Sequence, residues 1–172
     1  MRSIALRLAE CGLTMHPEKS KVVYCKDSNR TAIYPQVHFT FLGFTFRPRK
    51  ARGARNRLFT SFLPGVSADA LKRMRRAVRG WRIHRQTSAT LAELAKQCNP
   101  VIRGWWNYFG AFYRTAMQKV SGYIDQRLEQ WARRKYKTLL RRKRRSVEWL
   151  RKMRDESPRM FYHWSVAGNK VG

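Results

Sequence analysis

The side chains that most often carry out chemistry are few in this chain and lie far apart. Two-metal phosphoryl transfer needs several convergent carboxylates that hold the ions about 3.5–4 Å apart. Of the 10 Asp and Glu residues, only Asp155 and Glu156 are adjacent, and no third carboxylate accompanies them. The 3 cysteines form no Cys-x-x-Cys pair, the histidines are scattered, and no serine or cysteine stands in a nucleophile motif. The sequence therefore predicts no metal site and no catalytic residue in this chain.

Positive charge is instead the dominant chemical feature. The 172 residues include 38 Lys and Arg, and the formal net charge is +28. An excess of this size is typical of nucleic-acid-binding proteins, and the planar fork of arginine suits bidentate contacts with phosphate. Where basic residues gather without acids, we predict nucleic-acid-binding surfaces. The residues predicted to bind are Arg47, Arg49, Lys50, Arg52, Lys72, Arg73, Arg75, Arg76, Arg79, Arg82, Arg103, Asn107, Arg141, Arg142, Lys143, Arg144 and Arg145.

An anionic membrane is the alternative polyanion. A membrane binder more often concentrates its charge on one amphipathic helix, whereas here the charge is spread over several segments. The mean hydropathy is −0.62, and no run approaches the roughly 18 apolar residues of a membrane span. The N-terminus is too rich in charge for a secretory signal. We therefore expect a cytoplasmic protein with no membrane partner.

Residues 99–109, Asn-Pro-Val-Ile-Arg-Gly-Trp-Trp-Asn-Tyr-Phe, put a dense aromatic cluster on a predicted helix. Asn99 is the predicted N-cap of that helix and Pro100 its first residue. A glycine in a helix interior is unfavourable, so Gly104 is expected to permit a close helix approach. Helical spacing predicts a core stripe formed by Trp105, Phe109 and Phe112.

The other aromatic side chains of this cluster lie to the side of the stripe. Trp106 and Tyr113 are candidates for stacking on bases, which contributes about 1–3 kcal/mol per base, with burial against a neighbouring helix as the alternative. Arg103 and Asn107 are polar residues that a core role does not explain.

The N-terminal part of the chain has the pattern of a small sheet. Residues 2–11 predict a helix that Gly12 caps, and residues 47–57 predict a basic turn. Gly43 predicts a bulge or a close backbone approach within a strand. Strands are predicted at residues 21–25, 37–46 and 58–63.

The apolar period becomes helical after Pro64–Gly65. Ser67 is the predicted N-cap of a helix with Asp69 in its first turn. Thr90-Leu-Ala-Glu93 matches a capping box that begins a second helix. A third helix is predicted from about Ser121 to the basic run 141–145, and a short one at 147–153. The predicted core residues of the first and third helices are Leu71, Met74, Val78, Trp81, Ile124, Leu128, Trp131 and Leu139.

Three stretches, in order, resemble the reverse transcriptases and maturases of group II introns. Residues 12–21, Gly-Leu-Thr-Met-His-Pro-Glu-Lys-Ser-Lys, are similar to the late palm segment. Residues 41–44, Phe-Leu-Gly-Phe, resemble the primer-grip hairpin, with Leu42 and Gly43 as the grip. Residues 99–109 resemble the signature of the maturase-specific (thumb, or X) domain. The resemblance covers roughly residues 1–140.

The resemblance implies an α+β fold in which a partial palm β-hairpin sheet precedes an all-helical thumb/maturase bundle of about three helices. Residues 1–64 would be the remnant of the palm, residues 65–145 the maturase-specific domain, and residues 146–172 a basic C-terminal extension. Three strands with little to cover them are marginal alone, so we expect residues 1–64 to belong to a larger fold.

The same resemblance implies the chemistry of the family. Its palm holds a Tyr-x-Asp-Asp element whose carboxylates bind Mg²⁺ for RNA-directed DNA synthesis, and its thumb grips primer-template and binds intron RNA during splicing. No Asp-Asp pair occurs here, so we expect no cofactor in this chain and no polymerase activity without the N-terminal half of the reverse transcriptase. Lys19 would face nucleotide phosphates only with the missing palm.

The expected partners are therefore intron RNA, an RNA/DNA primer-template and that N-terminal half. The expected roles are RNA splicing and retrohoming of a mobile element. Two alternatives stay open at this stage: a stand-alone structural RNA-binding protein, and a truncated gene remnant without function.

Overall fold

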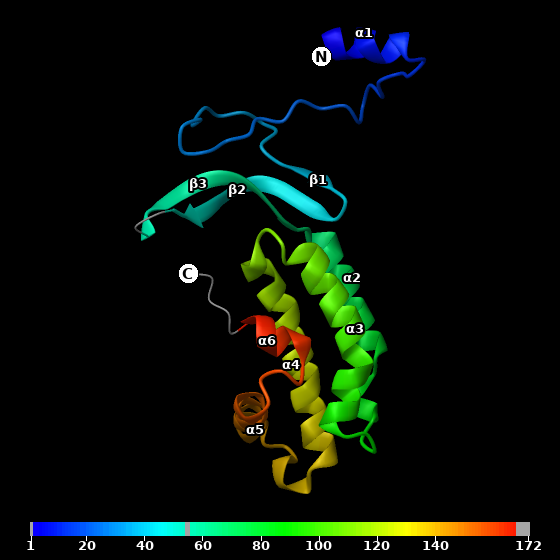
Figure 1. Ribbon diagram of the computed structural model, residues 1–172, viewed down its shortest axis with the longest axis vertical. Coiled ribbons are helices and arrows are strands. Elements are labelled where there is room, and N and C mark those ends of the chain that lie inside the picture. Colours follow the sequence, from blue (N-terminus) through cyan, green and yellow to red (C-terminus); the bar gives the residue numbers. More distant parts are fainter. Residues whose placement is uncertain (1, 54–55, 168–172) are drawn as a thin grey trace. The chain divides into compact units, whose positions relative to one another are not determined.

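The computed structural model describes residues 2–53 and 56–167 and confirms an α+β chain (Figure 1). Its strands are β1 (Phe39–Phe41), β2 (Phe44–Arg52) and β3 (Leu58–Val66). Its α-helices are α1 (Arg2–Glu10), α2 (Ala68–Gly80), α3 (Leu91–Phe109), α4 (Arg114–Lys135), α5 (Lys143–Glu156) and α6 (Tyr162–Ala167). Two short 3-10 helices follow α2 and α4, namely η2 (Ile83–Arg85) and η3 (Lys137–Leu139).

The chain divides into two compact units. Residues 1–39 and 47–62 form one unit, called here the N-terminal unit. Residues 40–46 and 63–172 form the other, called here the helical unit. No helix in the described ranges is long and apolar enough to cross a membrane.

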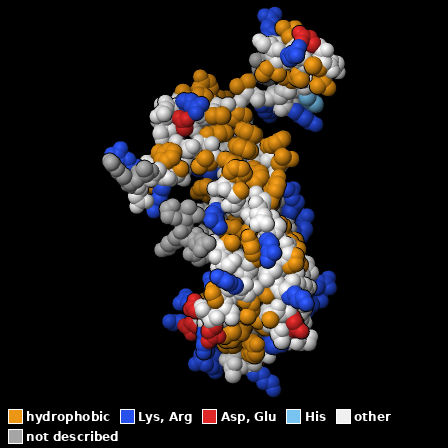
Figure 2. Space-filling view, in the orientation of Figure 1, with side chains coloured by type: hydrophobic (Ala, Val, Ile, Leu, Met, Phe, Trp, Pro, Cys, Tyr) orange, Lys and Arg blue, Asp and Glu red, His pale blue; other side chains and the backbone are white. Residues whose placement is uncertain are grey.

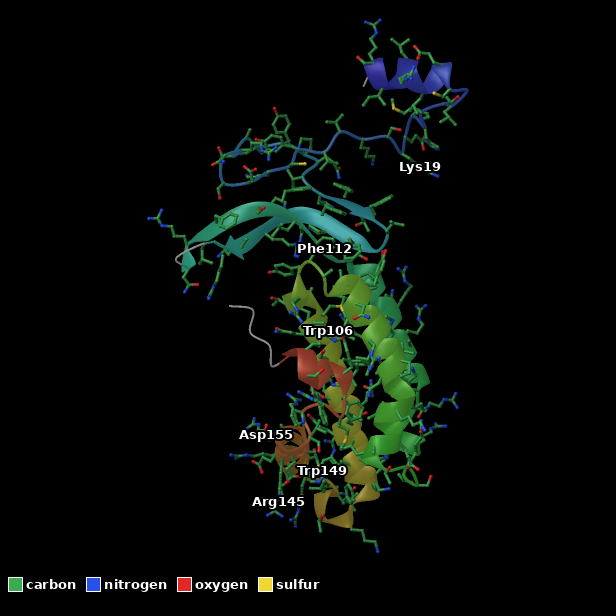
Figure 3. The ribbon with its side chains drawn as sticks, in the orientation of Figure 1. Lys19, Trp106, Phe112, Arg145, Trp149 and Asp155 are labelled. Atoms are coloured by element: carbon green, nitrogen blue, oxygen red, sulfur yellow. The ribbon has the colours of Figure 1, made fainter. Side chains whose placement is uncertain are left out.

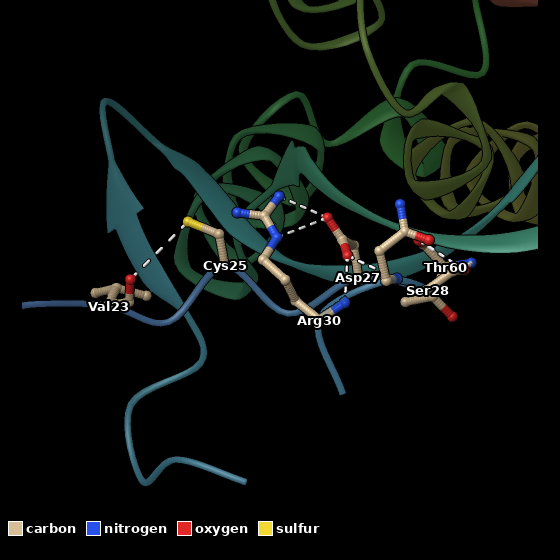
Figure 4. A network of polar contacts seen from close by, with 7 residues as sticks. Val23, Cys25, Asp27, Ser28, Arg30 and Thr60 are labelled. Carbon is tan, nitrogen blue, oxygen red and sulfur yellow. Dashed lines mark hydrogen bonds and ion pairs between the residues drawn. The ribbon is translucent and has the colours of Figure 1, made fainter. Parts of the chain in front are cut away.

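The N-terminal unit contains a network of polar contacts, and none of its described residues is buried. Gly12 caps α1 as predicted: its φ is +70°, and its N–H donates to the carbonyl of Ala9. The carboxylate of Asp27 accepts two hydrogen bonds from the Arg30 guanidinium, at 3.0 and 2.5 Å (Figure 4). These bonds hold the pKa of Asp27 below its usual value. Ser28 ties this loop to β3, because its N–H and hydroxyl both bond to the backbone of Thr60.

The three strands pair in the order β1-β2-β3, antiparallel. The single strand predicted at 37–46 is wrong, because the chain reverses at Leu42 and Gly43 with φ values of +48° and +81°. Positive φ at both central residues is the geometry of a tight hairpin turn. The basic turn predicted at 47–57 is also wrong, since residues 47–52 continue β2. The strand predicted at 21–25 is absent from the described residues, which are irregular there.

β3 continues through Pro64–Gly65, where the predicted strand ended. Proline has no N–H for the ladder and is tolerated at an edge, and β3 is an edge strand. α2 then begins as predicted. Ser67 Oγ accepts from the N–H of Ala70 at 3.1 Å, and Asp69 lies in the first turn. The core face of α2 consists of Ala70, Met74 and Val78, with Leu71 and Trp81 partly buried beside it.

α3 begins with the predicted capping box: Thr90 Oγ1 accepts from the N–H of Glu93, and the Glu93 carboxylate accepts from the N–H of Thr90. The restart predicted at Asn99 is wrong, because α3 runs unbroken through Pro100. The Asn99 side chain instead links α3 to the segment that begins α6. Its Nδ2 donates to the carbonyl of Met160 at 2.8 Å, and its Oδ1 accepts from the N–H of Tyr162 at 2.9 Å.

α4 contacts every other helix of the helical unit that the structure describes, and supplies the centre of its core. It begins at Arg114, well before the predicted Ser121. The predicted core residues Ile124, Leu128 and Trp131 are buried, as is Leu139 in η3. The third helix does not extend to 141–145. That run forms a turn and the start of α5, which carries the buried Leu150. Phe161, His163 and Trp164, around α6, are buried too, so the described part of 146–172 packs into the core.

Candidate nucleic-acid interface

α2 presents a cationic face opposite its core face. A 3.6-residue period puts Met74 and Val78 inward and turns the basic residues outward. These residues, all exposed, are Lys72, Arg73, Arg75, Arg76 and Arg79. Asp69, in the first turn, is the only acid on α2, and within the described ranges no ion pair involves the cations of this face. Figure 2 shows Lys and Arg side chains spread over the helical unit, with few acidic side chains among them.

Arg82 was predicted to continue this face but lies beyond the end of α2. It has a left-handed backbone with a φ of +48° and is exposed just before η2. Arg82 therefore does not continue the row of basic side chains on α2, although it follows that row closely in the sequence.

The basic residues of β2 belong to the N-terminal unit. Arg47, Lys50 and Arg52 are exposed and Arg49 is half-buried. Arg52 donates from Nη1 to Oδ1 of Asn56 at 3.2 Å. The extended backbone spaces alternate side chains on opposite faces of the strand.

The third basic run, residues 141–145, is exposed throughout and lies at the start of α5. Lys143, Arg144 and Arg145 occupy the first helical turn, where no acid is present. Figure 3 labels Arg145. Cations are unfavourable at the positive end of a helix dipole, so this arrangement does not serve helix stability. Arg144 pairs with Glu148 at 3.4 Å, which offsets part of the charge.

Arg103 and Asn107, the polar residues of the aromatic helix, are both exposed and both contact Tyr162 of α6. The Arg103 guanidinium lies 5.4 Å from the centre of the Tyr162 ring. The Tyr162 hydroxyl donates to Oδ1 of Asn107 at 3.0 Å. These contacts explain the two polar residues as part of the packing of α6 on α3.

The prediction for the aromatic stripe is wrong at one position. Phe112, predicted in the core, is 63% exposed, because α3 ends at Phe109 and the helical spacing stops there. Trp106, placed beside the stripe with burial against a neighbouring helix as the alternative to base stacking, is 6% exposed and continues the buried row of α3, so the burial alternative is confirmed. Trp105 is half-buried, with its ring stacked on Trp81 at 5.7 Å, and Phe109 is half-buried against Phe44. Tyr113 is half-buried.

The hairpin tip with Leu42 and Gly43 packs on the C-terminal end of α3, within the helical unit. The hydroxyl of Tyr108 donates to the carbonyl of Leu42 at 3.1 Å. A Cβ on Gly43 would lie 3.2 Å from Cε1 of Phe109, so the close approach predicted at this glycine is confirmed. The close approach predicted at Gly104 is wrong, because a Cβ there would meet no atom within 4 Å.

Sequence reasoning missed one cationic group of the helical unit. His84, Arg127, Arg133, Arg134 and Arg141 line a pocket of about 450 Å³ together with Gln130 and Leu140. Arg141 belongs to the basic run 141–145 that the sequence singled out, but its grouping with His84 of η2 and the arginines of α4 exists only in the folded chain. The i, i+7 spacing of Arg127 and Arg134 on one helix was the available signal.

The described residues show no arrangement suited to a metal ion. No three His, Cys, Asp or Glu side chains among them come together in a possible ligand group. The residues present thus do not fit a Mg²⁺ site. Lys19, labelled in Figure 3, is exposed after α1, and its backbone N–H donates to Nδ1 of His16 at 3.2 Å.

A basic helical unit with such a cationic face is typical of proteins that bind polyanions. Comparison with protein families identifies it further: residues 71–149 match the model of the group II intron maturase-specific domain. This match supports the assignment of this part of the chain as the C-terminal, maturase-specific portion of a group II intron maturase. Comparisons with curated proteins and with solved structures give no match. The domain supports a role in group II intron splicing and implies intron RNA as a partner.

Proposed function

We propose that the helical unit binds the phosphate backbone of structured intron RNA, and that α2 provides the main contact surface. The observation that carries this proposal is the exposed row from Lys72 to Arg79, which has no acidic partner among the described residues. Unpaired arginines on one helix face can each neutralise a phosphate and release counterions. The matched range, residues 71–149, contains this row.

The runs at 47–52 and 141–145 extend the proposed contacts to RNA and to an RNA/DNA primer-template. In this proposal the chain assists splicing and retrohoming as the thumb of an intron-encoded reverse transcriptase. Leu42 and Gly43, on the hairpin tip, form its primer grip. The chain binds nucleic acid without catalysing synthesis on its own, because its ten acids include no carboxylate cluster.

We further propose that synthesis of DNA requires a palm supplied by the N-terminal half of the reverse transcriptase, with Mg²⁺ bound there. The lack of buried residues in the described N-terminal unit supports this part of the proposal. Lys19 would reach nucleotide phosphates only in that assembly. Addition of an N-terminal half that carries the palm should therefore confer primer extension, which the purified chain alone should lack.

A salt titration of RNA affinity tests the α2 surface. Replacing Arg75, Arg76 and Arg79 with glutamine should weaken binding and flatten the slope of log K against log salt by up to about 2–3. Glutamine is nearly as good a helix former as arginine, and the core face of α2 is untouched, so the melting temperature should stay close to that of the parent chain.

The matched control removes three charges elsewhere. Lys137, Arg151 and Arg159 are exposed, and each can be replaced with glutamine. If both triple variants lower the slope equally, net charge alone accounts for binding and α2 is no specific surface. If the α2 variant alone lowers it, the proposed contact surface stands.

A further inference from the structure

The pocket beside α4 combines several cations from three segments. α4 contributes Arg127, Arg133 and Arg134, while His84 comes from η2 and Arg141 follows η3. Among the described residues that line the pocket, none is acidic. A volume of about 450 Å³ lies within the usual range of ligand sites, roughly 300–1,000 Å³.

The arginines of the pocket are oriented mainly by neutral partners. Arg127 donates to the Tyr123 hydroxyl and, at 2.8 Å, to Oε1 of Gln130, while its Nε is buried without a partner. Arg134 donates from Nη1 to the backbone carbonyl of His84 at 3.4 Å. These contacts fix the guanidinium groups without cancelling their charge. Arg133 is the exception, since Glu129 lies 4.0 Å away.

Backbone strain marks the rim of the pocket. Arg141 has a φ of +59°, in the left-handed region that side chains other than glycine, asparagine and aspartate seldom adopt. A residue other than glycine is strained in that conformation, because its Cβ lies too close to the following carbonyl oxygen. The strained turn after η3 brings a further guanidinium to a pocket that already holds three, although like charges repel. A bound anion would relieve that repulsion.

We propose that this pocket binds a phosphate group of RNA, held by Arg127, Arg134 and Arg141 with His84 beside it. The inference rests on the proposed RNA-binding function and assigns it a second, discrete site. The planar forks of arginine suit a tetrahedral oxyanion because each can donate two parallel hydrogen bonds. The phosphate can belong to the phosphodiester backbone or to a 5′ terminus.

Arg141→Gly tests the proposal without straining the fold. Glycine adopts a positive φ freely, so the variant should melt at or above the temperature of the parent chain. The probe is a 20-nucleotide RNA hairpin labelled at its 3′ end, prepared with a 5′-hydroxyl or a 5′-phosphate. Fluorescence anisotropy with the full chain should show that Arg141→Gly binds the RNA at least threefold more weakly than the charge-matched control Arg151→Ala does.

The two RNAs distinguish the sources of phosphate. A loss with both RNAs indicates the phosphodiester backbone, and a loss confined to the 5′-phosphorylated RNA indicates a terminal phosphate. Arg134→Gln, on the regular surface of α4, should reproduce the loss if Arg141→Gly fails to fold. If the pocket variants bind both RNAs as tightly as Arg151→Ala does, the site is refuted, and the α2 surface is tested separately by its salt slope.

Discussion

Asp125 on α4 accepts a hydrogen bond from the indole Nε1 of Trp164 on α6, at 2.9 Å. The same carboxylate accepts from Nε2 of the buried His163 at 3.0 Å and from Nη2 of Arg154 on α5 at 2.6 Å. Burial raises the pKa of Asp125, but the hydrogen bond from His163, helped by Trp164 and Arg154, brings that pKa below its usual value. One charged group thus ties both C-terminal helices to the centre of the domain.

Asp125→Asn should therefore destabilise the helical unit by about 2–4 kcal/mol, because it leaves buried donors without a charged acceptor. Urea unfolding followed by circular dichroism measures the loss. The control is Asp155→Asn, at an exposed residue of α5, which should change stability by less than about 0.5 kcal/mol. The contribution of Asp125 to the free energy of unfolding should be complete above its ordinary pKa of 3.8. It should be lost as the pH falls through the lowered pKa of the folded state. Equal losses in the two variants would contradict this role.

The buried face of α3, which differs from the face predicted from the sequence, gives a second prediction. Trp106→Ala should cost about 3–5 kcal/mol, since it removes a large buried side chain. Phe112→Ala should cost less than about 1 kcal/mol, because this ring is 63% exposed and meets Phe44 edge-on. Chemical unfolding of the two single variants makes the comparison. A larger loss in Phe112→Ala would restore the stripe predicted from the sequence.

The error in the predicted stripe has a simple physical origin. Leu94, Cys98, Ile102 and Trp106 form an unbroken i, i+4 row on α3, and all four are buried. Taking Asn99 as an N-cap broke that row and shifted the helix phase. The sequence could not show that the Asn99 side chain bonds to Met160 and Tyr162, some sixty residues away. Pro100 then lies within the helix, where local rules place it at the start.

Local sequence signals predicted helix ends correctly where the capping group bonds to residues a few positions away in the sequence. The cap at Ser67, the capping box at Thr90 and the glycine cap after α1 all follow from short-range chemistry and are confirmed. The hairpin at Leu42 was harder, because a leucine with a positive φ gives no local turn signal. The candidate binding surfaces differ in the same way. The basic residues of α2 lie close together in the sequence and could be predicted, whereas the residues of the α4 pocket come together only in the folded chain.

The two units should differ in stability. Hydrogen exchange should be slow in the core helices, where α4 buries Ile124, Leu128 and Trp131. It should be fast over residues 2–38, because α1 and the segment after it bury no side chain. Mass-spectrometric exchange on the purified chain resolves the two regions. Equally strong protection in both would indicate that the N-terminal unit is a complete fold by itself.

Two glycines should respond to alanine in opposite ways. Gly43→Ala should destabilise by about 1–3 kcal/mol, since φ is +81° and the new Cβ would press on Phe109. Gly104→Ala should stabilise by about 0.5–1 kcal/mol, because this exposed helix position has open space around it. Thermal unfolding of the pair is the measurement. Loss of stability in both would mean that α3 is approached closely at Gly104.

The last prediction concerns pH and the α4 pocket. Burial lowers the pKa of His84, and the charges of Arg134, Arg85, Arg127 and Arg82 lower it further. Arg133 and Arg141 also line the pocket, so the described charged residues that line it with this imidazole are all arginines; the α4 carboxylate Glu129 lies 4.0 Å from Arg133. The ring is thus neutral near pH 7, and a bound phosphate should raise its pKa.

Phosphate binding should then be accompanied by uptake of a proton. RNA affinity should increase roughly threefold to tenfold as pH falls from 7.5 to 6 at constant ionic strength. Phosphodiester groups do not titrate in this range, so His84→Gln should abolish most of the increase. His38→Gln, a change at an exposed residue of the N-terminal unit, should leave it intact. An increase that persists in His84→Gln would show that another group takes up the proton and that His84 does not face the bound phosphate.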